Sequence, residues 1–149
     1  MALKPIPEGF HTVTPYLVIT GVSRVMEFMK KAFDAKEVHK TARPDGTIMH
    51  AQMKIGDSMI MMGEANDQHQ AQPCSIYLYV KDTDAVYKQA VKAGGTSIME
   101  PMDMFYGDRN AGVKDSSGMQ WWIGTHIEDV GDAELAKRAE ASFKNQKRG

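Results

Sequence analysis

Hydrophobic and polar positions along this chain set out the same succession of secondary structure twice. Apolar side chains recur at helical spacing over residues 23–33, and Val86, Ala90 and Ala93 repeat that spacing over 83–93. One stretch rich in β-forming residues precedes each helical segment, and three follow it. The pattern predicts the order strand, helix, strand, strand, strand in each half, with strands at 11–20, 37–41, 48–55 and 58–64, then at 75–80, 97–102, 109–114 and 119–125.

Residues with capping chemistry lie at the ends of both predicted helices. Ser23 is expected to cap the first helix, and Asp82 or Thr83 the second, because short polar side chains accept hydrogen bonds from free backbone N–H groups. Asp34 is expected to end the first helix in a left-handed conformation, which aspartate tolerates better than most residues. Gly94 ends the second helix.

A polar stretch without periodicity, residues 65–72, separates the halves and is interpreted as a linker. We therefore expect one domain over 1–149, made of two modules at about 11–65 and 72–127. Residues 131–146 carry a thin apolar stripe among charges and are predicted to form a C-terminal helix. That helix is expected to lie on the body of the protein or on a partner chain.

The two halves align at a constant offset of 61 residues, which pairs the stretch 58–65 with the final predicted strand, 119–126. Helix ends and turns coincide at this offset, which chance matches would not do. Each half has too few strands to bury both faces of a sheet alone, so the two are expected to pack together. The identical pairs are Tyr16/Tyr77, Leu17/Leu78, Val25/Val86, Lys31/Lys92, Ala32/Ala93, Gly46/Gly107 and Gly63/Gly124.

Several short motifs accompany this duplicated order: Pro15-Tyr16-Leu17-Val18, Glu27-Phe28, Pro44-Asp45-Gly46, Tyr77-Leu78-Tyr79-Val80, Phe105-Tyr106-Gly107-Asp108-Arg109, and Trp121 with Thr125-His126. Over about residues 9–129 the chain resembles the vicinal oxygen chelate superfamily, which includes glyoxalase I, bleomycin-resistance proteins and extradiol dioxygenases, and within it the subgroup often labelled PhnB-like. The resemblance implies an α+β fold in which two tandem βαβββ modules form a half-barrel cup. It also implies a homodimer.

The metalloenzymes of this superfamily hold a divalent ion with one side chain from the first strand and one from the last strand of each module. The resemblance places these positions at Thr14, Met61, Ser75 and Trp122. Hydroxyl, thioether and indole groups do not suit such an ion, which prefers imidazole, carboxylate or thiolate. We therefore expect no metal and no other cofactor. A register slip of one residue would bring Glu64 or His126 nearer, although such a slip turns side chains to the other face.

Strand alternation assigns the other side chains to two faces. Met49, Ala51 and Met53 are expected to face the helix, and Trp121 to pack against it. Aromatic, thioether and sparse polar groups then face the cup, a composition typical of small-molecule pockets. The predicted ligand-binding residues are Thr14, Tyr16, His50, Gln52, Met59, Met61, Ser75, Tyr77, Tyr79, Arg109, Gln120 and Trp122, with Ala111 and Val113 beside them.

Three of these residues have a plain structural alternative. His50 is a candidate binding or acid–base residue, or it donates a hydrogen bond to a backbone carbonyl in a packed core. Arg109 either binds an anion or forms an ion pair with Asp108 at the turn. Trp122 is a stacking platform or a filler of the core.

The leading hypothesis is a metal-free protein that binds a small molecule in its aromatic cup. The alternative is an enzyme of the lyase, isomerase or dioxygenase type. Such an enzyme would use His50 as a catalytic general base, or a shifted metal site at His50, Glu64 or His126. A third interpretation is an interaction module, in which the C-terminal helix and the open sheet edges build a dimer.

Composition excludes some classes of partner but does not identify the ligand. The 149 residues carry a formal net charge of −1, which predicts no general affinity for nucleic acid or for membrane surfaces. Cys74 is the one cysteine, so no intrachain disulfide is possible, and a cytoplasmic location is expected. No apolar run approaches the ~20 residues of a membrane span, and the first residues lack a signal-peptide pattern.

Overall fold

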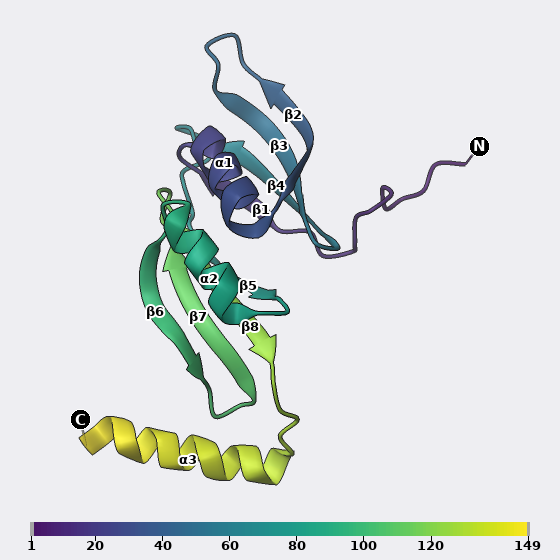
Figure 1. Ribbon diagram of the computed structural model, residues 1–149. Coiled ribbons are helices and arrows are strands. Elements are labelled where there is room, and N and C mark those ends of the chain that lie inside the picture. The colour runs from purple at the N-terminus through teal and green to yellow at the C-terminus, as the bar shows by residue number, and fades with distance from the viewer. Residues whose placement is uncertain (1, 149) are drawn as a thin grey trace.

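The first module follows the predicted element order in the computed structural model, which describes residues 2–148 (Figure 1). Its elements are β1 (Tyr16–Ile19), α1 (Val22–Phe33), β2 (Lys36–Ala42), β3 (Ile48–Ile55) and β4 (Ser58–Glu64). The four strands form one mixed sheet in the order β1-β4-β3-β2, with β1 parallel to β4 and the other neighbours antiparallel. The first strand begins at Tyr16 rather than at residue 11, directly after Pro15, which has no N–H to donate.

The second module repeats this topology. Its elements are β5 (Ser75–Tyr79), α2 (Thr83–Lys92), β6 (Thr96–Asp103), β7 (Asp108–Lys114) and β8 (Gln120–His126), and α3 (Asp132–Arg148) follows. The sheet order is β5-β8-β7-β6, again with the first and last strands parallel. The α+β class, the two βαβββ modules and the C-terminal helix are therefore confirmed, and the two sheets do not close into a barrel.

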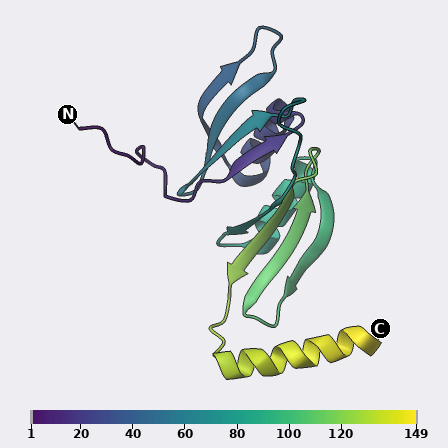
Figure 2. The same cartoon turned by 180° about the vertical axis from the view of Figure 1, so that it is seen from behind.

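Helices α1 and α2 pack against each other and lie on the same side of the molecule, as Figure 1 shows. Seen from behind in Figure 2, the strands of both sheets stand in front of the helices, so each sheet has one helix-covered face and one open face. The open face of each sheet is called its concave face below. The predicted cup residues are consequently divided between two sheets.

Trp121 connects the two modules through the core. Its side chain is fully buried, and its ring lies 5.1 Å from that of Phe33 at the end of α1. Its Nε1–H donates to Asp115 Oδ2 over 2.8 Å, so the buried indole has a hydrogen-bond partner. The prediction that Trp121 packs against a helix is confirmed.

The start of α1 differs from the prediction. Gly21 at φ 85° precedes the helix, and no side chain within the helix caps it. Instead, the Glu64 carboxylate accepts from the backbone N–H groups of Gly21 (2.8 Å) and Val22 (2.9 Å). The prediction that Ser23 caps this helix is wrong, because the end of β4 brings a charged acceptor to the same N–H groups. At the other end, Asp34 adopts the predicted left-handed conformation, at φ 55°.

The internal repeat slips by one residue between β4 and β3. Met62 and Ile123 correspond at the offset of 61, yet their neighbours across the sheet are Ala51 and Ala111, which differ by 60. The β7–β8 turn is one residue longer than the β3–β4 turn, which accounts for the slip. The prediction of an unbroken offset is therefore wrong. Because a shift of one residue changes the face, Ala111 and Val113 lie buried under the helices rather than in the cup.

Met49 is also placed on the other face. The pairs Thr41/His50 and Ala42/Ile48 leave Met49 as an extra residue in a bulge of β3. The bulge turns its side chain away from α1, and Met49 is 48% exposed. The prediction that Met49 faces the helix is wrong for this reason.

Helix α3 extends from the end of the second module (Figure 1). Arg138 fastens it there, with Nη2 2.6 Å from Glu128 Oε1 and Nη1 donating to the backbone oxygen of Phe105. Within residues 2–148, no helix has the length and apolar character needed to cross a membrane.

Candidate functional site

A tyrosine lies over a glycine on the concave face of each module. A Cβ built on Gly63 would lie 2.8 Å from the Tyr16 hydroxyl, and one built on Gly124 would collide with the Tyr77 ring and hydroxyl. The two modules therefore have the same residue types at these positions, tyrosine on the first strand and glycine on the last. The geometry explains this, because each tyrosine ring occupies the space that a side chain on the glycine would fill.

Trp122 lies on the second module in the same manner. A Cβ on Gly112 would come within 2.5 Å of Cζ3 of the indole ring, so this ring also rests on bare backbone. Trp122 is half-buried and stands beside Tyr77 in the β5–β8 register. The concave face of the second module therefore has an aromatic surface supported by two glycines.

Asp108 forms the polar centre of this face. The hydroxyls of Tyr77 and Tyr79 both donate to its Oδ2, over 2.9 and 3.0 Å, while Nδ1 of His126 lies 3.0 Å from its Oδ1. The carboxylate is buried at 4% exposure, and the two tyrosine rings lie 5.0 Å apart. We call Tyr77, Tyr79, Asp108 and His126 the tyrosine–aspartate cluster.

Hydrogen bonding sets the protonation states in this cluster. Burial by itself raises the pKa of Asp108, but hydrogen bonds from His126, Tyr77 and Tyr79 outweigh burial and hold that pKa below its ordinary value. Burial, and then the bond to Asp108, raise the pKa of Tyr77. The pKa of His126 is raised through Asp129 first, which lies 2.7 Å from Nε2, and then through Asp108. At neutral pH the cluster therefore contains a charged carboxylate and neutral phenols.

Asn110 follows Asp108 on the same face of β7. Its Nδ2 donates to the Tyr106 hydroxyl over 3.2 Å. Its Oδ1 is buried and has no hydrogen-bond partner in the described part of the chain. An unpaired buried acceptor is unusual in folded proteins, so this atom marks a place where a donor is missing.

The outer end of the face is closed by a bond between two predicted residues. The Ser75 hydroxyl donates to Gln120 Oε1 over 3.1 Å. Gln120 is half-buried and Ser75 is exposed. Gln120 precedes Trp122 on the same face of β8, and Ser75 precedes Tyr77 on the same face of β5, so the two continue the aromatic surface with polar groups.

Arg109 lies on the opposite face from the cluster. Its guanidinium forms a bidentate pair with Asp84 at the start of α2 (2.7 and 2.9 Å) and a further bond to Asp103 (2.9 Å). The one-residue slip in β7 turns it toward the helix, so the predicted position of Arg109 in the cup is corrected. The ion-pair alternative describes it better, although the partners are Asp84 and Asp103 rather than Asp108.

The first module carries a different set of groups. His50 stacks on Tyr16, with ring centres 5.9 Å apart, and its Nε2 lies 3.3 Å from Nε2 of Gln52. Met61 is half-buried on this face, and Met59 is buried near its edge. Thr14 lies before β1, where its hydroxyl donates to the backbone oxygen of His11.

A smaller pocket of about 370 Å³ opens beside this stack. Glu64 borders it, but both of its oxygens are bonded to the start of α1. The pocket is lined by Tyr16, Val18, Arg43, Met49, Gly63, Glu64, Asn66 and His69.

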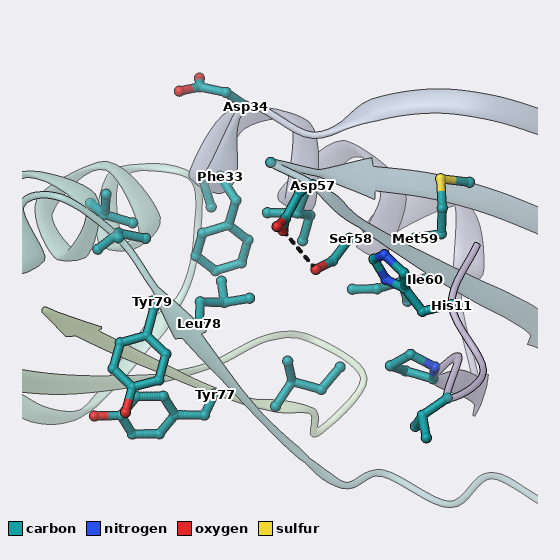
Figure 3. Close-up of a pocket in the computed structure, with 18 residues that line it drawn as sticks. His11, Phe33, Asp34, Asp57, Ser58, Met59, Ile60, Tyr77, Leu78 and Tyr79 are labelled. Atoms are coloured by element: carbon teal, nitrogen blue, oxygen red, sulfur yellow. Dashed lines mark hydrogen bonds between the residues drawn. The ribbon is translucent and has the colours of Figure 1, made fainter. Parts of the chain in front are cut away.

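The largest pocket described, about 620 Å³, lies between the modules along the free edge of β5 (Figure 3). The β3–β4 turn, Phe33 and the apolar residues of β5 line it, and His11 borders its far side. Tyr77 and Tyr79 belong to this lining as well as to the tyrosine–aspartate cluster. The two tyrosines therefore connect the concave face of the second module to the pocket.

The residues at the four metal positions do not fit a divalent ion. Thr14 and Ser75 are hydroxyls engaged in hydrogen bonds, Met61 offers a thioether, and the Trp122 ring covers Gly112. Across residues 2–148, no group of three or more His, Cys, Asp or Glu side chains is arranged to hold a metal ion.

The sequence interpretation missed three members of this site. At the constant offset, the sequence pattern places Asp108 in a turn and places neither Tyr106 nor Asn110 in the cup. The alternation of Asp108, Asn110 and Gly112 along β7 is the signal in the sequence that could identify them. A constant offset assigns the neighbouring residues of β7 to the cup instead, because it is wrong by one residue in this strand. The sequence suggests a role for His126 only as a ligand of a shifted metal site.

Comparison with known proteins agrees with this architecture. Residues 10–123 match the family model described as the glyoxalase/bleomycin resistance protein/dioxygenase superfamily. An uncharacterized protein of Mycobacterium bovis is 30% identical over 134 residues, covering 83% of this chain and 88% of that protein.

Two solved structures share the fold at lower identity. TioX from Micromonospora sp. ML1 has a TM-score of 0.68 at 20% identity, covering 78% of this chain and 99% of TioX. The PhnB protein from Bacillus cereus has a TM-score of 0.63 at 19% identity, covering 77% and 99%. By its family match and its relatives, the chain belongs to the glyoxalase/bleomycin resistance protein/dioxygenase superfamily.

Proposed function

We propose that this protein binds a small organic molecule, without a metal ion, on the aromatic face of its second module and in the adjoining pocket. The tyrosine–aspartate cluster carries the proposal. Tyr77 is held on Gly124 and tied to Asp108, so its ring is positioned before any ligand arrives. A binding surface that is already ordered loses less conformational entropy when it is occupied.

The dimensions and chemistry of the site support this function. The pocket of about 620 Å³ falls within the range of roughly 300–1,000 Å³ that is typical of small-molecule sites. Tyr77 and Tyr79 remain 38% and 68% exposed, so apolar ring surface is left for a ligand to cover. A mostly apolar surface with a few fixed polar groups is the composition expected of such a site.

A thermal-shift screen against metabolites and antibiotics tests the proposal. A compound present at a hundred times its Kd adds about 2.7 kcal/mol to the unfolding free energy. For a chain of this size that corresponds to a rise of roughly 5–10 °C in Tm. At least one compound is expected to give such a rise in the wild type and in Tyr16→Ala, the matched control in the first module, but not in Tyr79→Ala. A screen without any stabilising compound would contradict the proposal.

The second candidate is an enzyme of the lyase, isomerase or dioxygenase type. One observation favours it: buried Asp108 holds Nδ1 of His126, while Nε2 faces the exposed Asp129, an arrangement that suits proton transfer. His50 is the corresponding candidate in the first module. Elemental analysis of protein purified without chelator would detect a bound metal, and loss of turnover in His126→Gln or His50→Ala would separate catalysis from binding.

We also propose that the protein forms a homodimer in the cytoplasm. Strands β1, β2, β5 and β6 lie at the ends of their sheets and have no second strand neighbour in the described residues, and such edges commonly pair with another chain. Light scattering at micromolar concentration measures the assembly directly, and a monodisperse monomer would argue against the dimer.

A further inference from the structure

The tyrosine–aspartate cluster fixes the direction of its hydroxyl protons. Tyr77 and Tyr79 both donate to the same oxygen of Asp108, so neither hydroxyl has a proton left for a ligand. Their phenolic oxygens keep lone pairs, which can only accept. A ligand that meets these two tyrosines therefore meets hydrogen-bond acceptors and aromatic faces.

The charges around the cluster, like its acceptors, favour a cationic ligand. Asp108 and Asp129 flank His126, so the two carboxylates leave the group net negative whether or not the imidazole is protonated. Two arginines of this module and of α3 are paired on other surfaces, Arg109 with Asp84 and Asp103, and Arg138 with Glu128 and Glu134. A phenol that donates to a carboxylate is polarised toward its oxygen and ring, which strengthens its attraction for a cation.

Asn110 supplies a second and independent observation. The residue is 5% exposed, and it lies between Asp108 and Gly112 on the same face of β7. Its unpaired Oδ1 is one more acceptor without a donor. The Asp108 carboxylate, the two phenolic oxygens and Asn110 Oδ1 are therefore all hydrogen-bond acceptors.

We propose that the ligand of the second module carries a protonated amine next to an apolar or aromatic group. The ammonium would lie against the oxygens and rings of Tyr77 and Tyr79, and the apolar part would cover Trp122. This inference rests on the proposed binding function and names the class of ligand. An anionic ligand would meet the charge of Asp108 and no free donor from the two tyrosines.

Three probes of the same shape separate the possibilities: 2-phenylethylamine, which is protonated at neutral pH, neutral 2-phenylethanol, and anionic phenylacetate. NMR titrations of the full-length protein follow the indole N–H of Trp122, while buried Trp121 serves as the internal reference. We expect the amine to bind at least fivefold more tightly than the alcohol, and the acid to bind most weakly.

Variants then locate the preference. Asp108→Asn keeps the shape and removes the charge, and it is expected to reduce the preference for the amine to less than twofold. Tyr79→Phe, at a position that is 68% exposed, removes one acceptor and is expected to weaken the amine about threefold while leaving the alcohol unchanged. Asp103→Asn, an acid on the opposite face, is the matched control and should change neither affinity.

The outcomes distinguish this inference from the proposed function. Equal or tighter binding of the alcohol or the acid overturns the amine class, and so does an amine preference that survives both Asp108→Asn and Tyr79→Phe. If no probe moves the Trp122 signal although the thermal screen finds a ligand, the amine inference fails and the binding function stands. If the probes and the screen both find nothing, both fail.

Discussion

Gly124→Ala is expected to disturb the concave face without unfolding the second module. The φ of Gly124 lies outside the left-handed region, so alanine can adopt the same backbone. The new methyl group would instead collide with the Tyr77 ring and hydroxyl. Tyr77 then has to leave its place, and its bond to Asp108 is broken.

Two opposing effects set the size of the change. Replacing glycine by alanine within a strand stabilises the fold by about 0.5–1 kcal/mol, because the unfolded chain loses freedom. Losing a hydrogen bond to a charged group costs about 1.5–3 kcal/mol. The net expectation is a loss of about 1–2 kcal/mol in unfolding free energy. With Tyr77→Ala already present the methyl group has room, so the same substitution should stabilise by about 0.5–1 kcal/mol.

Urea unfolding followed by circular dichroism measures all four proteins of this double-mutant cycle. The expected coupling between the two positions is about 2 kcal/mol. The reasoning would be refuted if Gly124→Ala had the same effect in both backgrounds, or if it stabilised the wild type.

Three further predictions follow from other contacts. Glu64→Ala removes the acceptor at the start of α1 and should lower the unfolding free energy by about 1–2 kcal/mol in urea. Trp121→Phe removes the bond to Asp115 and part of a buried ring, and should cost about 2 kcal/mol by the same assay. Because the pKa of Asp108 is lowered in the folded state, its ionised carboxylate stabilises the fold at pH values above 3.8, the ordinary pKa of this group. This contribution is lost as the pH falls through the pKa of the folded state. Because the pKa of His126 is raised in the folded state, its protonation stabilises the fold fully at pH values below 6.5, the ordinary pKa of this group. This contribution is lost as the pH rises through the pKa of the folded state. In a plot of unfolding free energy against pH, Asp108→Asn should therefore show a weaker dependence than the wild type on the acid side, and His126→Gln a weaker dependence on the alkaline side.

The element order could be predicted from the sequence because periodicity and turn chemistry are local properties. The left-handed Asp34 and the Asp82 cap of α2 depend only on neighbouring residues, and both are present. The start of α1 could not be predicted in this way, because its acceptor, Glu64, arrives from β4, more than forty residues along the chain.

The candidate site was harder to predict because it depends on register between strands. The aromatic residues Tyr77 and Trp122 were assigned to the concave face from alternation alone, and they lie on it. The polar partner was missed because one additional residue in the β7–β8 turn displaces the offset in β7. A prediction that ignores this additional residue places Arg109 in the site and leaves Asp108 outside it.

The same turn has a consequence for how the protein unfolds. Asp115 accepts from the backbone N–H groups of Ser117 and Met119 and from the indole of Trp121, and Trp121 packs on Phe33 in the other module. Opening the turn therefore releases a buried indole, and releasing the indole exposes the end of α1. The modules consequently share one cooperative melting transition, and tryptophan fluorescence and backbone circular dichroism should report the same midpoint.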